Sequence, residues 1–169
     1  MAFLAGIAGM FAFGAWRHHR ASSAFTIEGH AVVARGPGLR IPLSEAWTFQ
    51  KNEPGVDFVA THESTGAVLT GQVSVERDAA KPIAKVLDEV VEGRRKKWGA
   101  VEQEERGQAP IGDVNFAYAE FVVPRGDEKV NARVYYARRR GQAITLSCGG
   151  HVLAQQACGL AFKKAEWTH

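Results

Sequence analysis

The sequence predicts an α+β fold: an antiparallel β-sheet with an amphipathic helix and a C-terminal helix packed on it, preceded by an N-terminal apolar membrane helix. Three observations lead to this prediction. Residues 67–76 and 129–138 alternate apolar and polar side chains with the period of two that is typical of a half-buried strand. Residues 81–92 repeat their apolar side chains with the period of a helix. Residues 1–16 contain no charged side chain.

The apolar N-terminal segment, residues 1–16, is followed at once by the basic run Arg17-His18-His19-Arg20. As a helix it would reach roughly 24 Å, short of the ~30 Å hydrocarbon core but tolerable with local thinning of the bilayer. Small residues recur at four-residue steps, which would let another helix approach closely in lipid, although simple Gly/Ala richness explains the pattern equally well. We expect residues 1–20 to form a membrane anchor whose bilayer contacts are made by Phe3, Leu4, Ile7, Met10, Phe11, Phe13 and Trp16.

Two other interpretations of this segment stay open. A cleaved secretory signal would need a basic region ahead of the apolar run, and no Lys or Arg precedes Trp16, although residues 21–24 resemble a cleavage site. A buried core helix would need a polar face, and this segment is apolar all round. We favour the uncleaved anchor. Residues 21–24 are then a linker and residues 25–167 a single domain, because about 150 residues suit one hydrophobic core.

The elements of this domain follow from periodicity and turn residues. A first strand or hairpin within residues 22–35 is ended by Gly36-Pro37-Gly38, and an extended segment over residues 39–49 follows. Hairpin-like turns at residues 124–127 and 140–141 make the later part of the sheet antiparallel. The remaining strands are expected at residues 56–61, 67–76, 101–106, 114–123, 129–138 and 142–148.

Each of the two expected helices has one apolar face. The first should pack Ile83, Val86, Leu87, Val90 and Val91 on the sheet, since these side chains recur at i, i+3, i+4, i+7 and i+8. The second, over residues 151–164, should present Leu153, Ala157, Leu160 and Ala161 to it. Both helices should therefore cover the sheet with a single face.

The two cysteines can meet in this arrangement. Cys148 shares a strand face with Ile144 and Leu146, Cys158 lies on the helix that folds back across the sheet, and the ten-residue separation is short enough to close. The alternative is two reduced, buried thiols. A disulfide indicates an oxidising compartment and hence a periplasmic or otherwise extracytoplasmic domain. The arginines after the anchor favour the cytoplasmic face instead. We favour the extracytoplasmic location.

Charge and motifs exclude several classes of function. With 21 Lys+Arg against 18 Asp+Glu, the net charge of +3 is too small for a nucleic-acid binder. Cys148 and His151 are too close in sequence to form a convincing thiol and base, and with Cys158 they match no standard zinc spacing. Phosphate-loop, zinc-protease and nucleophile-elbow motifs do not occur. We therefore expect no catalytic residue, cofactor, metal or small-molecule substrate, and no enzyme.

A family resemblance rests on the landmarks Pro42, Trp47 and Phe49 together with the element order: two strands, a helix, four antiparallel strands and a C-terminal helix. Over residues 25–167 the chain resembles the PsbP/DcrB-like superfamily. The resemblance implies a binding or scaffolding role, because the superfamily includes photosystem accessory subunits, bacterial envelope proteins and lipoproteins, and the Eag chaperones. This chain lacks the early cysteine of the lipoprotein members, and no ligand-binding residue carries over.

The resulting hypothesis is a non-catalytic, membrane-anchored accessory or scaffolding subunit that docks on a larger membrane or envelope protein complex. The lipid bilayer contact is assigned to residues 1–16. The alternative is an Eag-like chaperone or carrier that shelters an apolar segment of a partner protein. That role needs exposed apolar positions on the sheet, for which the candidates are Ala119, Phe121 and Tyr135.

Overall fold

The computed structural model describes residues 24–51, 54–76, 78–98, 102–151 and 153–168. The expected membrane anchor and its seven apolar contact residues lie outside these ranges. Among the residues that are described, no helix combines the length and the apolar character needed to cross a bilayer.

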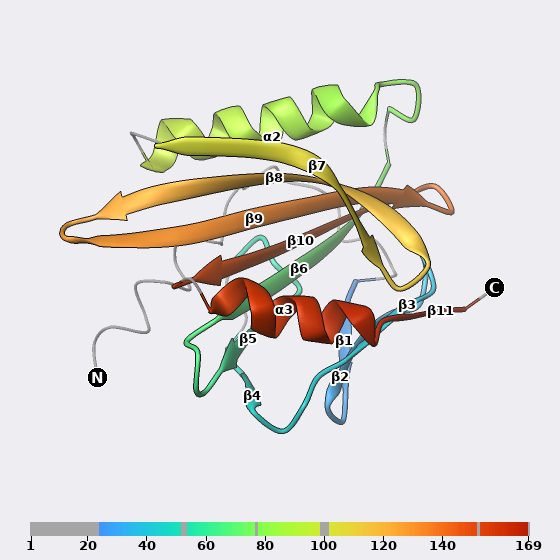
Figure 1. Ribbon diagram of the computed structural model, residues 1–169. Helices are drawn as coiled ribbons and strands as arrows, with labels where there is room; N and C mark the ends of the chain where they lie inside the picture. The colour runs from blue at the N-terminus through green and yellow to red at the C-terminus, as the bar shows by residue number, and fades with distance from the viewer. Residues whose placement is uncertain (1–23, 52–53, 77, 99–101, 152, 169) are drawn as a thin grey trace.

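The strands form two antiparallel sheets rather than the single sheet expected (Figure 1). One sheet has four strands in the order β1-β2-β3-β11, and the other has seven in the order β4-β5-β6-β10-β9-β8-β7. In chain order the elements are β1 (Thr26–Glu28), β2 (Ala31–Ala34), β3 (Leu39–Pro42), β4 (Trp47–Phe49), β5 (Phe58–His62), β6 (Val68–Val75), α2 (Ile83–Trp98), β7 (Gln103–Ile111), β8 (Val114–Arg125), β9 (Glu128–Arg139), β10 (Gln142–Gly150), α3 (Ala154–Lys163) and β11 (Glu166–Trp167).

The second sheet gains its fourth strand because the C-terminal strand returns to the N-terminal part of the domain. Trp167 of β11 pairs with Leu39 of β3, and the short strands β1, β2 and β3 pair with one another. The indole N–H of Trp167 donates a 2.7 Å hydrogen bond to the carbonyl of Ile111, next to the β7–β8 turn. The C-terminal residues thus connect the two sheets.

The seven-stranded sheet is covered on both faces. Helix α2 packs on β8 and β9, while α3 packs on β10 and β7 on the other side and also contacts β3 (Figure 1). Adjacent residues of β9 therefore enter different cores: Tyr135 belongs to the core under α3 and Tyr136 to the core under α2. The expectation of half-buried strands is wrong here, and even the polar side chains of Thr70 and Ser147 are buried.

The first predicted helix is confirmed, and so is the face it packs. α2 starts directly after Pro82, whose missing N–H is harmless at a helix start, and it continues through Gly93 to Trp98. Its five predicted apolar residues all contact the core under this helix. The prediction for α3 is wrong for two of four residues. Leu153 and Leu160 are 56% and 62% exposed, because the packed face is made of Ala154, Ala157, Cys158, Ala161 and Phe162.

Candidate functional site

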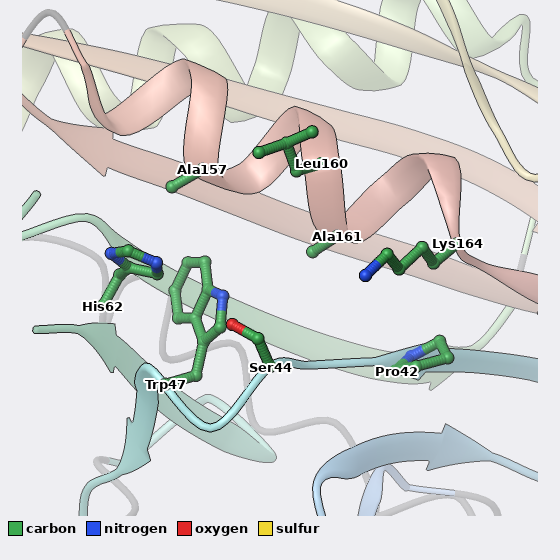
Figure 2. A pocket seen from close by; sticks show the side chains of 8 residues that line it. All are labelled: Pro42, Ser44, Trp47, His62, Ala157, Leu160, Ala161 and Lys164. Atoms are coloured by element: carbon green, nitrogen blue, oxygen red, sulfur yellow. The ribbon is translucent and has the colours of Figure 1, made fainter. Parts of the chain in front are cut away.

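A pocket of about 190 Å³ lies between α3 and the segment that leads from β3 through β4 to β5 (Figure 2). We call it the α3–β4 pocket. It is the candidate site because small helix residues and a buried indole leave open space beside an otherwise tightly packed core. The residues that line it are Pro42, Ser44, Trp47, His62, Ala157, Leu160, Ala161 and Lys164.

The strand side of the pocket is held by the pairing of β4 with β5. Trp47 and His62 are cross-strand partners, and their rings meet edge to face with centroids 5.1 Å apart. Trp47 is 4% exposed. The His62 Nδ1 atom lies 3.1 Å from the Thr65 hydroxyl and 3.3 Å from the Ser64 hydroxyl, which fixes the imidazole ring. The two rings therefore form a rigid wall.

The helix side is held by α3. Ala157 and Ala161 are buried on its inner face, and their short side chains leave the space that forms the pocket. Leu160 stands at the rim with most of its surface in solvent. The disulfide between Cys148 and Cys158 ties the middle of α3 to β10, with 6.4 Å between the two Cα atoms. Small residues and the cross-link together fix the distance from helix to sheet.

Three polar groups of the pocket are hydrogen-bond donors without a side-chain partner among the described residues. The Trp47 indole N–H, the Ser44 hydroxyl and the Lys164 ammonium make no side-chain hydrogen bond or ion pair to described residues. Figure 2 shows the indole nitrogen on the edge of the ring turned toward Ser44, and the Lys164 side chain extending along the helix toward the same space. None of the lining residues is acidic. Such a site is suited to binding an acceptor group.

Ser44 and His62 both line the pocket, and the His62 Nδ1 atom lies against the hydroxyls of Thr65 and Ser64. The described residues contain no group of three or more His, Cys, Asp or Glu side chains placed to hold a metal ion. The arrangement can bind and orient a partner or ligand.

The predicted interaction patch is wrong. Ala119, Phe121 and Tyr135 are 0%, 1% and 3% exposed. Ala119 and Phe121 lie beneath α2, and Tyr135 lies beneath α3, where its ring meets that of Phe162 at 5.0 Å between centroids. The prediction failed because α2 and α3 cover opposite faces of this sheet, so neither face presents these side chains to solvent.

Charged side chains on the strands form a second cluster with a structural role. Glu76 accepts hydrogen bonds from the Tyr136 hydroxyl at 2.8 Å and from Arg138 Nε at 2.6 Å. Burial opposes ionisation of Glu76, but the hydrogen bonds from Tyr136, from the Asp78 N–H and from Arg138 lower its pKa. Burial raises the pKa of Tyr136 to about 12. Arg138 also donates to the carbonyls of Asp78 and Ala79, at 3.2 Å each, and so fastens the loop ahead of α2.

The sequence pointed to some of these residues for other reasons. Trp47 stood out as a landmark, and the two cysteines were expected to meet, as they do in the structure. His62 was not among the candidate site residues, yet it is half buried against Trp47. The signal that could have found the pocket is the pair of alanines on the buried face of α3, opposite a segment with a bulky aromatic.

Comparison with known proteins establishes the fold. No protein-family model matches the sequence, and no curated protein matches it significantly. Among solved structures, the cyanobacterial PsbP protein CyanoP of Synechocystis is similar, with a TM-score of 0.60 and 14% identity over 92% of this chain and 97% of its own. LpqN of Mycobacterium tuberculosis, described as involved in cell envelope biogenesis, has a TM-score of 0.57 and 12% identity over 82% of this chain and 90% of its own.

A third similar structure is longer. A protein of Bacteroides thetaiotaomicron has a TM-score of 0.58 and 12% identity over 85% of this chain, and this chain spans 50% of its length. These similarities confirm the predicted resemblance at the level of fold: the described domain is PsbP-like.

Proposed function

We propose that this protein is a non-catalytic accessory subunit, anchored in a membrane by residues 1–16, whose domain docks on a larger membrane or envelope protein complex. The observation that carries the proposal is the outer surface of α3. Leu153, the N-cap residue of α3, and Leu160 are seven residues apart and so lie on the same side of the helix, and both are exposed. Leu160 also lines the α3–β4 pocket. The PsbP-like fold, shared with the envelope protein LpqN, agrees with this role.

The exposure of these leucines does not come from a loosely held helix. The opposite side of α3 is buried, and Cys158 is cross-linked to Cys148 at the centre of the sheet. A single exposed leucine is ordinary on a protein surface, but two aligned leucines form a coherent surface for a partner. Burying what remains exposed of both would contribute roughly 2 to 4 kcal/mol of hydrophobic free energy.

The disulfide also supports an extracytoplasmic location for the domain. Disulfides persist in the periplasm and outside the cell and are rare in the reducing cytoplasm. The arginines that follow residues 1–16 favour the cytoplasmic side, so the orientation is part of the proposal.

The proposed docking is tested with the full chain in its native membrane. After mild detergent extraction, we expect the protein to migrate with a stoichiometric membrane complex on a native gel. Leu153→Glu combined with Leu160→Glu should abolish this comigration, because two carboxylates would be desolvated at the interface. Ile27→Glu, which alters an exposed apolar residue on the edge strand β1, is the matched control and should comigrate normally. A monomeric wild type, or a double variant that still comigrates, would refute the proposal.

The chaperone alternative loses the sheet patch on which it depended, since those three residues are buried. What favours it now is the α3–β4 pocket, whose apolar wall could receive a side chain of an extended client. The native gel distinguishes the two functions: an accessory subunit gives a stable membrane complex, whereas a chaperone gives a binary complex with one client.

A further inference from the structure

We propose that the α3–β4 pocket is a binding site for a compact apolar carboxylate, meaning an apolar group of a few carbon atoms that ends in a carboxylate. This inference is independent of the docking proposed above, because the pocket can hold such a group whether or not the outer surface of α3 meets a partner. It also departs from the expectation that the protein takes no small molecule; the bound group is a ligand and undergoes no reaction.

The first observation is the indole N–H of Trp47. The side chain is more than nine-tenths buried, and within the described residues its N–H has no hydrogen-bond acceptor. Indole nitrogen is a donor only. The Trp47 Nε1 atom is not among the fully buried, unpaired side-chain atoms of the described residues, so water in the pocket reaches it, and a ligand that enters the pocket can replace this water as the acceptor.

The second observation is that the other polar groups are a cation and a hydroxyl, with no anion among them. The Lys164 ammonium and the Ser44 hydroxyl also reach this space, neither has a side-chain partner among the described residues, and no lining residue is acidic. A positive charge and two neutral donors together select a negatively charged acceptor. An ionised carboxylate has only acceptor sites, so it satisfies all three groups without leaving a donor of its own unpaired.

The third observation is the rest of the lining. Pro42, Ala157, Leu160 and Ala161 form an apolar wall, which suits hydrocarbon attached to the carboxylate. A volume of about 190 Å³ corresponds to roughly six water molecules, below the range of about 300 to 1,000 Å³ that holds drug-sized ligands. The geometry therefore selects five- or six-carbon monocarboxylates and disfavours amines, which Lys164 would repel, and long chains.

Two sources present this chemistry: a free monocarboxylic acid, and the last residue of a polypeptide with an apolar side chain. Both place a carboxylate beside Trp47, Ser44 and Lys164 and a short hydrocarbon against the alanines of α3. A C-terminal residue additionally carries an amide N–H that needs an acceptor at the mouth of the pocket. Hexanoate and N-acetyl-leucine therefore serve as the two probes.

The test follows the Trp47 indole resonance by ¹H–¹⁵N NMR of the full chain in nanodiscs, with the resonance assigned by its loss in Trp47→Phe. Hexanoate should shift it saturably, whereas hexanol and hexylamine, which carry the same six-carbon chain without a carboxylate, should not. Lys164→Met should weaken hexanoate binding at least tenfold. Lys163→Met, which removes the neighbouring exposed lysine outside the pocket, is the matched control and should leave the affinity unchanged.

The outcomes separate the sources and the failures. Tighter binding of N-acetyl-leucine than of hexanoate assigns the site to a chain end, and the reverse order assigns it to a free acid. Equal shifts with hexanoate and hexanol, no saturable shift with either probe, or equal losses in the two lysine variants would each overturn the proposal. If the leucine variants lose the native membrane complex but still bind hexanoate normally, docking and ligand binding are separate functions, as proposed.

Discussion

At the scale of single residues, the cluster of Glu76, Tyr136 and Arg138 shows how buried polarity is tolerated. Only 8% of the Glu76 side chain and 17% of the Arg138 side chain are exposed, so each charge depends on the other. The Tyr136 hydroxyl shares the same carboxylate oxygen as Arg138 Nε. Removing any member would leave a charge or a donor without its partner in a partly desolvated site.

This cluster predicts how stability depends on pH. The pKa of Tyr136 rises from 10.0 in the unfolded chain to about 12, so its stabilising contribution is complete below pH 10 and is lost as the pH rises to about 12. The pKa of Glu76 is lowered, so its contribution is present above the usual value of 4.5 and is lost as the pH falls below it.

Urea unfolding across a pH series measures both effects. Tyr136→Phe should flatten the decline above pH 10, and Glu76→Gln should flatten the decline on the acid side. Arg35→Met, which breaks a solvent-exposed ion pair with Glu28, is the control and should change the unfolding free energy by less than about 1 kcal/mol. Variants whose profiles parallel the wild type at both extremes would contradict this account.

At the scale of elements, the stability of α3 depends on a disulfide, whereas α2 is held by side-chain packing. α3 has ten residues and buries mainly alanines, whereas α2 has sixteen and packs larger apolar side chains on the sheet. Alanines bury little apolar surface, so they contribute little hydrophobic stabilisation. The disulfide supplies the stabilisation that the small residues of α3 cannot provide. The same small residues leave the space that forms the pocket.

Replacing both cysteines by alanine should therefore lower the unfolding free energy by about 2 to 4 kcal/mol. Hydrogen exchange should accelerate in α3, with α2 as the internal control. In the unmodified protein, thiols should react with a maleimide only after denaturation together with reduction. Reaction after denaturation alone would mean that Cys148 and Cys158 are not joined, and equal acceleration in both helices would mean that the cross-link has no local effect.

At the scale of the whole molecule, the two ends of the chain differ in their role. The described fold begins at residue 24, and the Phe25 N–H is already bonded to the Asp57 carboxylate. At the other end, Trp167 is bonded to the Ile111 carbonyl, lies beneath the Arg139 guanidinium at 4.6 Å, and packs against Gly112. A Cβ at Gly112 would meet the indole ring at 2.9 Å, so only glycine lets the tail approach so closely.

Two truncations test this difference. Removing residues 1–23 should leave a folded domain with an unchanged cooperative unfolding transition, because the observed strands and helices start later. Removing residues 166–169 should lower the unfolding free energy by about 2 to 4 kcal/mol through the loss of a packed aromatic and its hydrogen bond. Circular dichroism with urea unfolding measures both. If the chain without residues 1–23 is unfolded, those residues belong to the core. If removing residues 166–169 leaves the unfolding free energy unchanged, the C-terminal residues do not connect the two sheets.

The sequence by itself determined the α+β class, the order of strands and helices between residues 56 and 164, the packed face of α2, and the shared strand face of Cys148, Ile144 and Leu146. Each of these depends on periodicity along one stretch of chain. The tertiary structure alone decided which strand faces are buried, which distant strands pair, and where a pocket opens. Tyr135 is buried because α3 returns across its face, and the N-terminal sheet gains a fourth strand because Trp167 pairs with Leu39. The pocket opens because Ala157 and Ala161 come to lie opposite Trp47. Burial and cavities are set by which distant segments meet, whereas periodicity records only how a segment is oriented about its own axis.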